Sequence, residues 1–382
     1  MNRILLLTLL LGFSLSTLAQ ENPAPPNFEK SKPAIYIDVR HESGAILGNG
    51  TDVGQQLINS SYYNGLEVRL GFRSTDDRDV YSSVYRRPTY GIGMYSSTFH
   101  NESFGKPHAL YFFLMIPFTF QKDHRFTFNY TGAFGISYNF NPYDPIENPY
   151  DNFIGSYRNC YVHLGFTANY RITPKWTLNS TFGFKHFSNG SFKQPNYGIN
   201  LLPLSVGIRY RITAREPMLY ASPIPSYLKH YLLNISLYAG SKNYEYGKPN
   251  YLKAGIGITA LKQISYKHRV GLGMDFYYSP GYDDRYTGGE ENFKNTTSIA
   301  FGGAWDWVLT PRLEVPVALM FYANRDAVNG EKGPFYERAG LRYRWTSYLH
   351  TGLTIKAHKG VADFFEWTLG YTIHKDKNKF KY

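Results

Sequence analysis

A histidine and a serine two residues apart are the best candidates for chemistry in this sequence. His186 and Ser188 would share one face of a β-strand, because side chains at i and i+2 point the same way. An imidazole beside a hydroxyl can take its proton, which is the arrangement that activates a serine nucleophile. A plainer interpretation also fits, in which a strand ends and Ser188-Asn189-Gly190 is ordinary turn chemistry.

The segments on both sides of this pair alternate between apolar and polar residues, which predicts strands with one apolar face. A loop of turn-forming residues, 189–198, separates them. His186 and Ser188 fall on the apolar face of the first strand. The apolar positions share one parity in each strand: Trp176, Leu178, Phe182 and Phe184 before the loop, and Leu202, Leu204, Val206, Ile208, Tyr210 and Ile212 after it.

The same alternation recurs along nearly the whole chain. It predicts about sixteen strands of about ten residues, the pattern of a transmembrane antiparallel β-barrel. About eight strands precede residue 213, and the others follow a Pro-rich segment at 214–229. A soluble β-sandwich would alternate too, but the outward rows here are uniformly apolar and aromatic.

Composition favours the barrel. Aromatic residues make up 18% of the chain, with 35 Tyr and 27 Phe, although the mean hydropathy is only −0.39. Tyr and Trp gather at the lipid–water boundaries of membrane barrels, whereas a soluble core needs no such number of Tyr. The net charge of +12 suggests an anionic neighbour. Because the basic residues are scattered and form no run, we expect no nucleic-acid partner.

Strand alternation predicts a barrel but does not show whether the chain forms one barrel or two. We expect one all-β barrel of about 14–16 strands, with two tandem eight-stranded barrels as the alternative. The corresponding regions are a first half at 32–213, the Pro-rich linker at 214–229 and a second half at 230–382. The linker would suit either a hinge between two barrels or a long periplasmic turn.

The first residues read as a secretory signal. A basic start, an apolar stretch and the small-x-small site Thr17-Leu18-Ala19 predict cleavage after Ala19, with 1–19 removed and 20–31 left as a flexible leader. An uncleaved anchor is the alternative. Combined with the barrel pattern, this predicts a protein of the outer membrane.

The motif around the pair resembles that of the outer-membrane lipid A 3-O-deacylases (PagL-type), and more closely the longer acyloxyacyl hydrolases of Bacteroidetes-like genomes. The resemblance is carried by His186-Phe187-Ser188-Asn189, Pro195-Asn196 and Gly198-Ile199-Asn200. It implies Ser188 as nucleophile, His186 as general base, and Asn189 and Asn196 at the oxyanion site. The glutamate with which the family orients its histidine falls on Asn200. An asparagine there can hold the ring but adds no negative charge.

The resemblance therefore implies an esterase that removes an acyl chain from lipid A, with lipopolysaccharide and outer-membrane lipid as its partners. The apolar parity of His186 and Ser188 agrees, since the ester lies just under the headgroups. The alternative is a non-catalytic barrel, structural or a pore, with a decayed motif. We expect no cofactor or metal, because the histidines are dispersed and Cys160 stands alone.

A rival pair lies near the C-terminus, His358 and Glu366, in which Glu366 is the alternative source of the missing acid. Parity argues against this role. Both residues oppose apolar rows, so we expect a charged pair inside the lumen, near Arg342 or Arg344.

Overall fold

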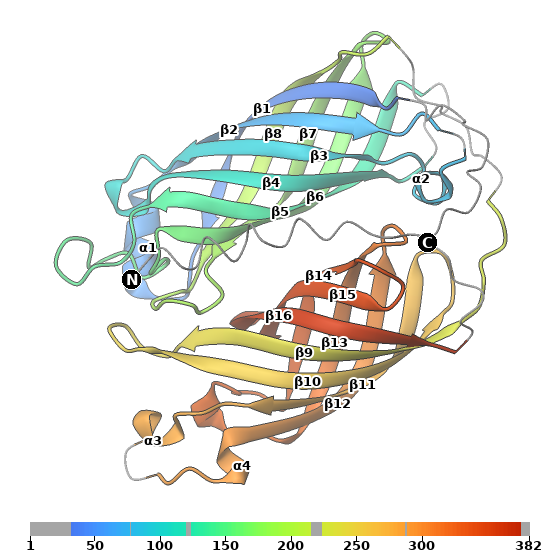
Figure 1. Cartoon of the computed structure of the whole chain (residues 1–382). Helices are drawn as coiled ribbons and strands as arrows, with labels where there is room; N and C mark the ends of the chain where they lie inside the picture. Colours follow the sequence, from blue (N-terminus) through green and yellow to red (C-terminus); the bar gives the residue numbers. More distant parts are fainter. Residues whose placement is uncertain (1–31, 77, 120–123, 215–223, 287–288, 376–382) are drawn as a thin grey trace, which may run out of the picture. The chain divides into compact units, whose positions relative to one another are not determined.

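The chain folds into two closed antiparallel β-barrels of eight strands each (Figure 1). This computed structural model describes residues 32–76, 78–119, 124–214, 224–286 and 289–375. The expected barrel architecture is confirmed in its tandem form, and the preference for a single large barrel was wrong. Periodicity could not decide this, because strand alternation is the same whether β8 pairs with β1 or with β9.

Barrel 1 closes where its first strand pairs with its last. β1 pairs with β2 on one side and with β8 on the other, where Tyr36 faces Arg211 and Leu47 faces Asn200. The strands of barrel 1 are β1 (Ala34–Leu47), β2 (Tyr63–Arg73), β3 (Thr89–Thr98), β4 (Gly105–Pro117), β5 (Phe126–Phe140), β6 (Arg158–Arg171), β7 (Trp176–Ser188) and β8 (Ile199–Arg211).

Barrel 2 closes in the same way, by pairing of β9 with both β10 and β16. Its register shifts within the β12–β13 pair and near the end of the β15–β16 pair. The strands of barrel 2 are β9 (Tyr231–Asn243), β10 (Asn250–Gln263), β11 (His268–Tyr278), β12 (Thr297–Val308), β13 (Leu313–Asn324), β14 (Phe335–Arg344), β15 (Leu349–His358) and β16 (Val361–His374).

The short helices all lie in the connections between strands. None of the described helices is long and apolar enough to cross a membrane. They are α1 (Asp52–Asn59), α2 (Val80–Val84), α3 (Tyr282–Arg285) and α4 (Phe293–Thr296), with 3-10 turns η2 (Glu102–Phe104) and η3 (Ala327–Asn329). The predicted signal at 1–19, the leader at 20–31 and most of the predicted linker lie outside the described residues.

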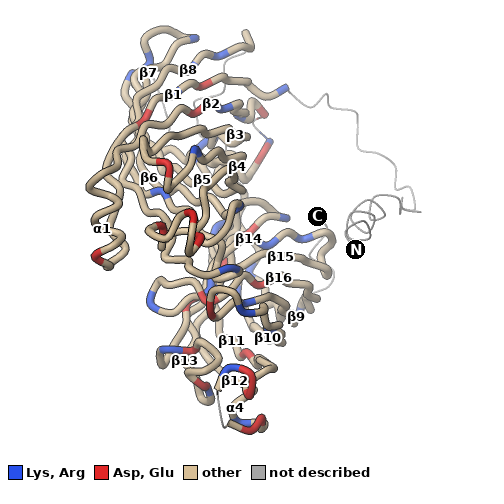
Figure 2. The backbone as a smooth tube through the Cα atoms, turned by 90° about the vertical axis from the view of Figure 1, so that its left-hand side faces the viewer, with Lys and Arg blue, Asp and Glu red and all other residues tan. Residues whose placement is uncertain are grey.

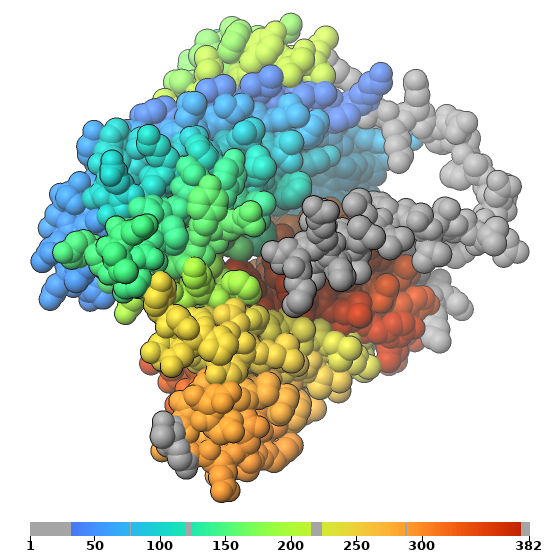
Figure 3. Space-filling view, turned by 60° about the vertical axis from the view of Figure 1, so that its left-hand side comes forward, coloured from blue at the N-terminus to red at the C-terminus, as the bar shows by residue number. Residues whose placement is uncertain are grey.

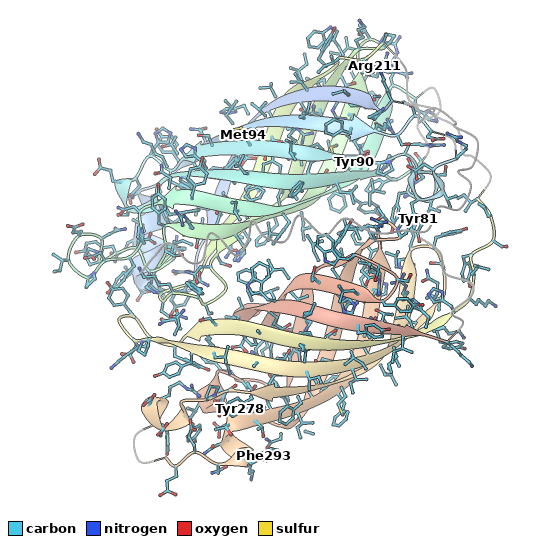
Figure 4. All side chains as sticks on the ribbon, in the orientation of Figure 1. Tyr81, Tyr90, Met94, Arg211, Tyr278 and Phe293 are labelled. Atoms are coloured by element: carbon cyan, nitrogen blue, oxygen red, sulfur yellow. The ribbon has the colours of Figure 1, made fainter. Side chains whose placement is uncertain are left out.

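Each strand places apolar side chains on the outer wall and polar ones in the lumen. On β3, for example, Tyr90 and Met94 are exposed on the outside (Figure 4). The outer wall of barrel 1 is a continuous surface in the view of Figure 3. Such an apolar exterior over a polar interior is the arrangement that a lipid environment selects.

The lumen of barrel 1 is filled by buried charged and aromatic side chains. Lys185 Nζ lies 2.6 Å from Glu42 Oε1 and 3.3 Å from Glu67 Oε1, and Glu67 also pairs with Arg69 at 2.8 Å. Charged residues accordingly occur on strands as well as in loops (Figure 2). An eight-stranded barrel is just wide enough for its side chains to fill it, so this interior forms a packed core.

An aromatic cluster fills the end of barrel 1 at which β7 ends and β8 begins. It packs residues from several strands against the β5–β6 loop, 141–157. The loop contributes Phe153 and Ile154, both fully buried. The opposite end of the lumen is lined mainly by polar and charged side chains, among them Arg73, Asn129 and Asn169. The candidate catalytic residues are therefore at the end of the barrel that the packed apolar core fills.

Candidate active site

His186 lies on the outer, apolar side of β7, near the end of that strand. Phe182, four residues earlier on the same face, is 56% exposed, whereas Lys185 on the opposite face is fully buried. The ring of Phe184 stacks on the His186 ring, with centroids 6.3 Å apart. The imidazole therefore continues the apolar row along β7, as the alternation of the sequence predicts.

Asn200 is the direct partner of His186 across the β7–β8 pair. Its side-chain oxygen Oδ1 lies 2.6 Å from His186 Nδ1. An amide oxygen only accepts hydrogen bonds, so Nδ1 carries the proton and donates it to Asn200. Nε2 is then left with its lone pair, which is the protonation state that a general base requires.

Ser188 is the last residue of β7 and is almost entirely buried, with 6% exposure. It faces Cys160 across the β6–β7 pair, two register positions beyond the pairing of His186 with Val162. Its hydroxyl makes no hydrogen bond with any other described residue, His186 included. Catalytic hydrogen bonds are often formed only when substrate is bound, so this geometry does not exclude the pair.

Gly198, immediately before β8, packs against both members of the pair. Its φ of +77° is one that residues with a side chain rarely adopt. A Cβ added there would lie 2.7 Å from His186 Cε1 and 3.4 Å from Ser188 Cβ. The glycine is therefore needed both for its backbone conformation and for the close approach of the imidazole.

Asn189 and Asn196 organise the β7–β8 loop between them. The backbone N–H of Asn189 donates to Asn196 Oδ1 at 3.0 Å. Asn189 Nδ2 donates to Ser156 Oγ and to the carbonyl of Lys193, both at 2.9 Å. Both amide hydrogens of Asn189 are therefore in use, whereas Asn196 Nδ2 has no hydrogen-bond acceptor among the described residues.

The β5–β6 loop, 141–157, supports the site from below, a contribution that sequence reasoning missed. The N–H of Gly198 donates to the carbonyl of Phe153 at 2.9 Å, and Ser156 accepts from Asn189. Asp151, which is fully buried, accepts from the N–H of Phe153 at 3.0 Å. Burial raises the pKa of Asp151 to about 7. The run of turn residues around 141–152 gave no signal of this contact, because it joins loops distant in sequence.

Glu366 is fully buried inside barrel 2, on the luminal side that parity predicts. Its ion-pair partner is Arg338, with Nε 2.6 Å from Glu366 Oε2, and Tyr277 and Thr354 also donate to it. The expected neighbours were wrong, since Arg344 lies in an ion pair with Glu314 instead. Strand alternation predicts that Glu366 points into the lumen. Which arginine it meets there depends on the register between the strands, which alternation does not predict.

His358 does not pair with Glu366, contrary to the expectation of a charged pair. Its Nε2 lies 2.9 Å from the hydroxyl of Tyr322, and its Nδ1 lies 3.9 Å from Asp363 Oδ2. Among the described residues, no three His, Cys, Asp or Glu side chains are grouped so as to hold a metal ion.

Two family models match the chain. Residues 63–209 match the model described as lipid A 3-O-deacylase (PagL), and residues 231–375 match the C-terminal domain of acyloxyacyl hydrolase. Together they cover well over half of the chain, and the first contains all five predicted site residues. No curated protein sequence matches the chain significantly.

Solved outer-membrane barrels are similar to this chain only at a low level. The outer-membrane protein Omp33 of Acinetobacter baumannii is 7% identical, with 89% of this chain and 98% of that chain covered and a TM-score of 0.15. OccK8 (OprE) of Pseudomonas aeruginosa is 10% identical, with 90% and 98% covered and a TM-score of 0.24. Scores this low carry no argument, and the fold rests on the strand pairing itself.

Proposed function

The chain belongs to the lipid A 3-O-deacylase (PagL) and acyloxyacyl hydrolase family, and from that premise we propose that it hydrolyses an acyl ester of lipid A. Membership of this family also supports a location in the outer membrane. The observation that carries the proposal is the lipid-facing imidazole of His186, whose Nδ1 is held by Asn200. That contact leaves Nε2 as a base on the face where acyl chains lie.

In the proposed reaction, His186 Nε2 takes the hydroxyl proton of Ser188 as Oγ attacks the ester carbonyl carbon. The tetrahedral intermediate collapses when the C–O bond to the sugar breaks, and His186 gives the proton to the departing sugar oxygen, which leaves as a hydroxyl. Water then attacks the acyl-serine with His186 again as base, which releases the fatty acid and restores Ser188. The lipid-facing position of His186 lets the ester reach the pair without leaving the membrane.

The oxyanion of the intermediate needs a hydrogen-bond donor aimed at it. Asn196 Nδ2 supplies this donor in our proposal, because its Oδ1 is already occupied by the N–H of Asn189. Asn189 acts on Asn196 and on the loop, since both of its own amide hydrogens are engaged. The family motif implies that both asparagines lie at the oxyanion site. In our proposal Asn196 donates to the oxyanion, and Asn189 holds Asn196 and the loop in place.

A non-catalytic barrel is the second candidate, favoured by the neutral Asn200 in place of a glutamate. A pore is the weaker form of this candidate, because the lumen of barrel 1 is occupied by buried ion pairs and aromatic rings. Measurement of fatty-acid release from lipid A distinguishes a structural role from catalysis.

The test is mass spectrometry of lipid A incubated with the full-length protein in lipid vesicles. Ser188→Ala and His186→Ala should each abolish release of fatty acid, since members of one catalytic unit lose activity together. Ser180→Ala is the matched control, because Ser180 lies on the same strand and the same face of β7. Folding of each variant is checked by heat-dependent gel mobility. Unchanged lipid A processing by folded Ser188→Ala would refute the mechanism.

A further inference from the structure

The β7–β8 loop, 189–198, makes hydrogen bonds to barrel 2 as well as to barrel 1. Both barrels lie within one compact unit of the chain. The N–H of Asn243, the last residue of β9, donates to the carbonyl of Ser191 at 2.8 Å. The hydroxyl of Ser191 donates to the carbonyl of Ala362, on β16, at 2.9 Å. Because β9 and β16 pair with each other, both contacts fall on one patch of barrel 2.

Asn243 also holds the loop at a second point, closer to Asn196. Its side-chain oxygen Oδ1 accepts from the N–H of Gln194 at 3.2 Å, and its backbone carbonyl accepts from Gln194 Nε2 at 3.3 Å. The Asn243 side chain is itself fixed, since its Nδ2 donates to the carbonyl of Lys248 at 2.8 Å and the residue is only 3% exposed. The end of β9 therefore presents a rigid hydrogen-bond acceptor to the loop.

The β5–β6 loop of barrel 1 packs against the same segment of the β7–β8 loop. A Cβ added to Gly155 would lie 2.6 Å from the carbonyl of Gln194 and 2.6 Å from the carbonyl oxygen of Pro195. The β5–β6 loop touches barrel 2 as well, through an edge-to-face contact of Tyr143 with Tyr246, with ring centroids 5.1 Å apart. Close packing by barrel 1 and hydrogen bonds from barrel 2 thus hold one short stretch of backbone.

This stretch lies directly before Asn196, the residue that donates to the oxyanion in our proposed reaction. Gln194 precedes it by two residues, and Ser188 precedes Ser191 by three. The distance between Asn196 Nδ2 and the Ser188 hydroxyl therefore depends on a loop whose backbone is tied to barrel 2. A displacement of about 1 Å in a catalytic group can cost on the order of 10² in rate.

We propose that barrel 2 positions the catalytic loop of barrel 1, and that Asn243 is a positioning residue acting through Asn196. This inference rests on the proposed function, in which Asn196 is the oxyanion donor. The two barrels also touch at their other ends, where the hydroxyl of Tyr85 donates to the carbonyl of Val308 at 2.5 Å. The second barrel thereby gains a role in catalysis that requires no ligand site or channel of its own.

The first experiment measures kcat and KM for fatty-acid release from lipid A vesicles by the full-length protein. Asn243→Ala should lower kcat by about tenfold with KM unchanged, because the loop loses one hydrogen bond. Asn196→Ala should lower kcat by about 100-fold, since the oxyanion loses its donor. In the Asn196→Ala background, Asn243→Ala should have no further effect, because a residue that acts through another has nothing left to position.

Asn324→Ala is the matched control. Asn324 is the last residue of β13, as Asn243 is of β9, at the same end of barrel 2. Its Nδ2 also donates to backbone carbonyls, those of Lys294 and Thr297, but these lie within barrel 2. This variant loses comparable hydrogen bonds without releasing the β7–β8 loop, so kcat should stay at the wild-type value.

Hydrogen exchange of the loop amides separates this inference from the proposed function. Asn243→Ala should raise exchange within 189–198 by about tenfold and leave the strands of barrel 1 unchanged, whether or not fatty acid is released. Faster loop exchange in a protein that never hydrolyses lipid A would refute the proposed function and keep the loop contact. Unchanged loop exchange, or additive losses of kcat for Asn243→Ala and Asn196→Ala, would overturn the positioning role.

A second pair of variants tests the contact from the side of the loop, without changing Asn243. A Cβ added to Gly190 would collide with the ring of Phe365, on β16, and the φ of +61° also disfavours a side chain there. Gly190→Ala should therefore lower kcat, and adding Phe365→Ala, which removes the ring, should recover part of the loss. An equal loss of kcat with and without the Phe365 ring would overturn the inference.

Discussion

Replacing Asn200 by aspartate tests whether the site lacks only the charge of the family's acid. The two side chains have nearly the same shape, so a carboxylate oxygen would take the place of Asn200 Oδ1, 2.6 Å from His186 Nδ1. The imidazole would keep its orientation and its tautomer. In the transition state, however, the protonated ring would face a negative charge in place of a neutral dipole.

The gain follows from two opposing contributions. Opposite charges about 4 Å apart attract by ~4 kcal/mol at the effective dielectric of a protein surface. Removing the new carboxylate from water costs part of this, because Asn200 is half-buried beside an apolar wall. Loss of the charge in a serine triad costs on the order of 10⁴ in rate, which sets the upper limit. We expect Asn200→Asp to raise turnover by about 10- to 100-fold, equivalent to ~1.4–2.7 kcal/mol. The longer side chain of Asn200→Glu should give a smaller gain.

The assay is the initial rate of fatty-acid release from lipid A vesicles. Asn59→Asp, at the exposed end of α1, adds the same charge to a loop at the same end of the barrel and should leave the rate unchanged. Asn200→Ala should lower the rate by about tenfold, because the ring loses one hydrogen bond. If folded Asn200→Asp is no faster than wild type and Asn200→Ala is equally active, then Asn200 does not orient the base.

Three further predictions concern two residues that support the site and the rival carboxylate inside barrel 2. Gly198→Ala should lower fatty-acid release by about 100-fold, because its Cβ would displace the His186 ring and small misplacements of catalytic groups are costly; an unchanged rate would contradict this. Burial raises the pKa of Asp151 to about 7, so between about pH 4 and 7 the folded protein holds a proton that the unfolded chain has lost. The free energy of unfolding should therefore fall as pH rises from about 4 to 7. Urea unfolding at pH 5 and pH 8 measures this fall, and Asp151→Asn should remove it. Glu366→Gln should leave fatty-acid release unchanged in the folded protein while destabilising barrel 2 by roughly 1.5–3 kcal/mol, since Arg338 loses one of its two carboxylate partners and keeps Asp275 at 2.9 Å. Loss of activity without loss of stability would assign the catalytic acid to barrel 2.

The alternation of the sequence predicted the strands and their faces well, because a period of two is a local property. Phe182 and His186 on the outside, with Lys185 inside, follow from parity alone. Asn200 was assigned beside His186 only through the family motif. The structure agrees with that contact because β7 and β8 are joined by one loop, which brings the two residues into direct register.

Contacts that depend on register across several strands escaped prediction. Glu366 was expected near Arg342 or Arg344 but pairs with Arg338, because the offset of β14 against β15 and β16 decides which inward residues meet. The support of Gly198 by Phe153 likewise joins two loops whose sequences show only turn residues. Alternation identifies the face of a residue, and register then selects its neighbour on that face.

The number of barrels depends on one pairing that the sequence does not encode locally. β8 pairs with β1 through the contact of Tyr36 with Arg211, and this closes the first sheet after eight strands. An eight-stranded barrel brings its inward charges within contact of one another, as in the pair of Lys185 with Glu42 and Glu67. In a sixteen-stranded barrel the same side chains would line a wide aqueous channel. Lys185 lies on β7 and Glu42 on β1. These two strands lie on either side of β8 only when the barrel closes after eight strands. The small barrel is therefore the one in which these buried charges compensate each other, and the preference for a single barrel failed because strand alternation does not show which strands close the sheet.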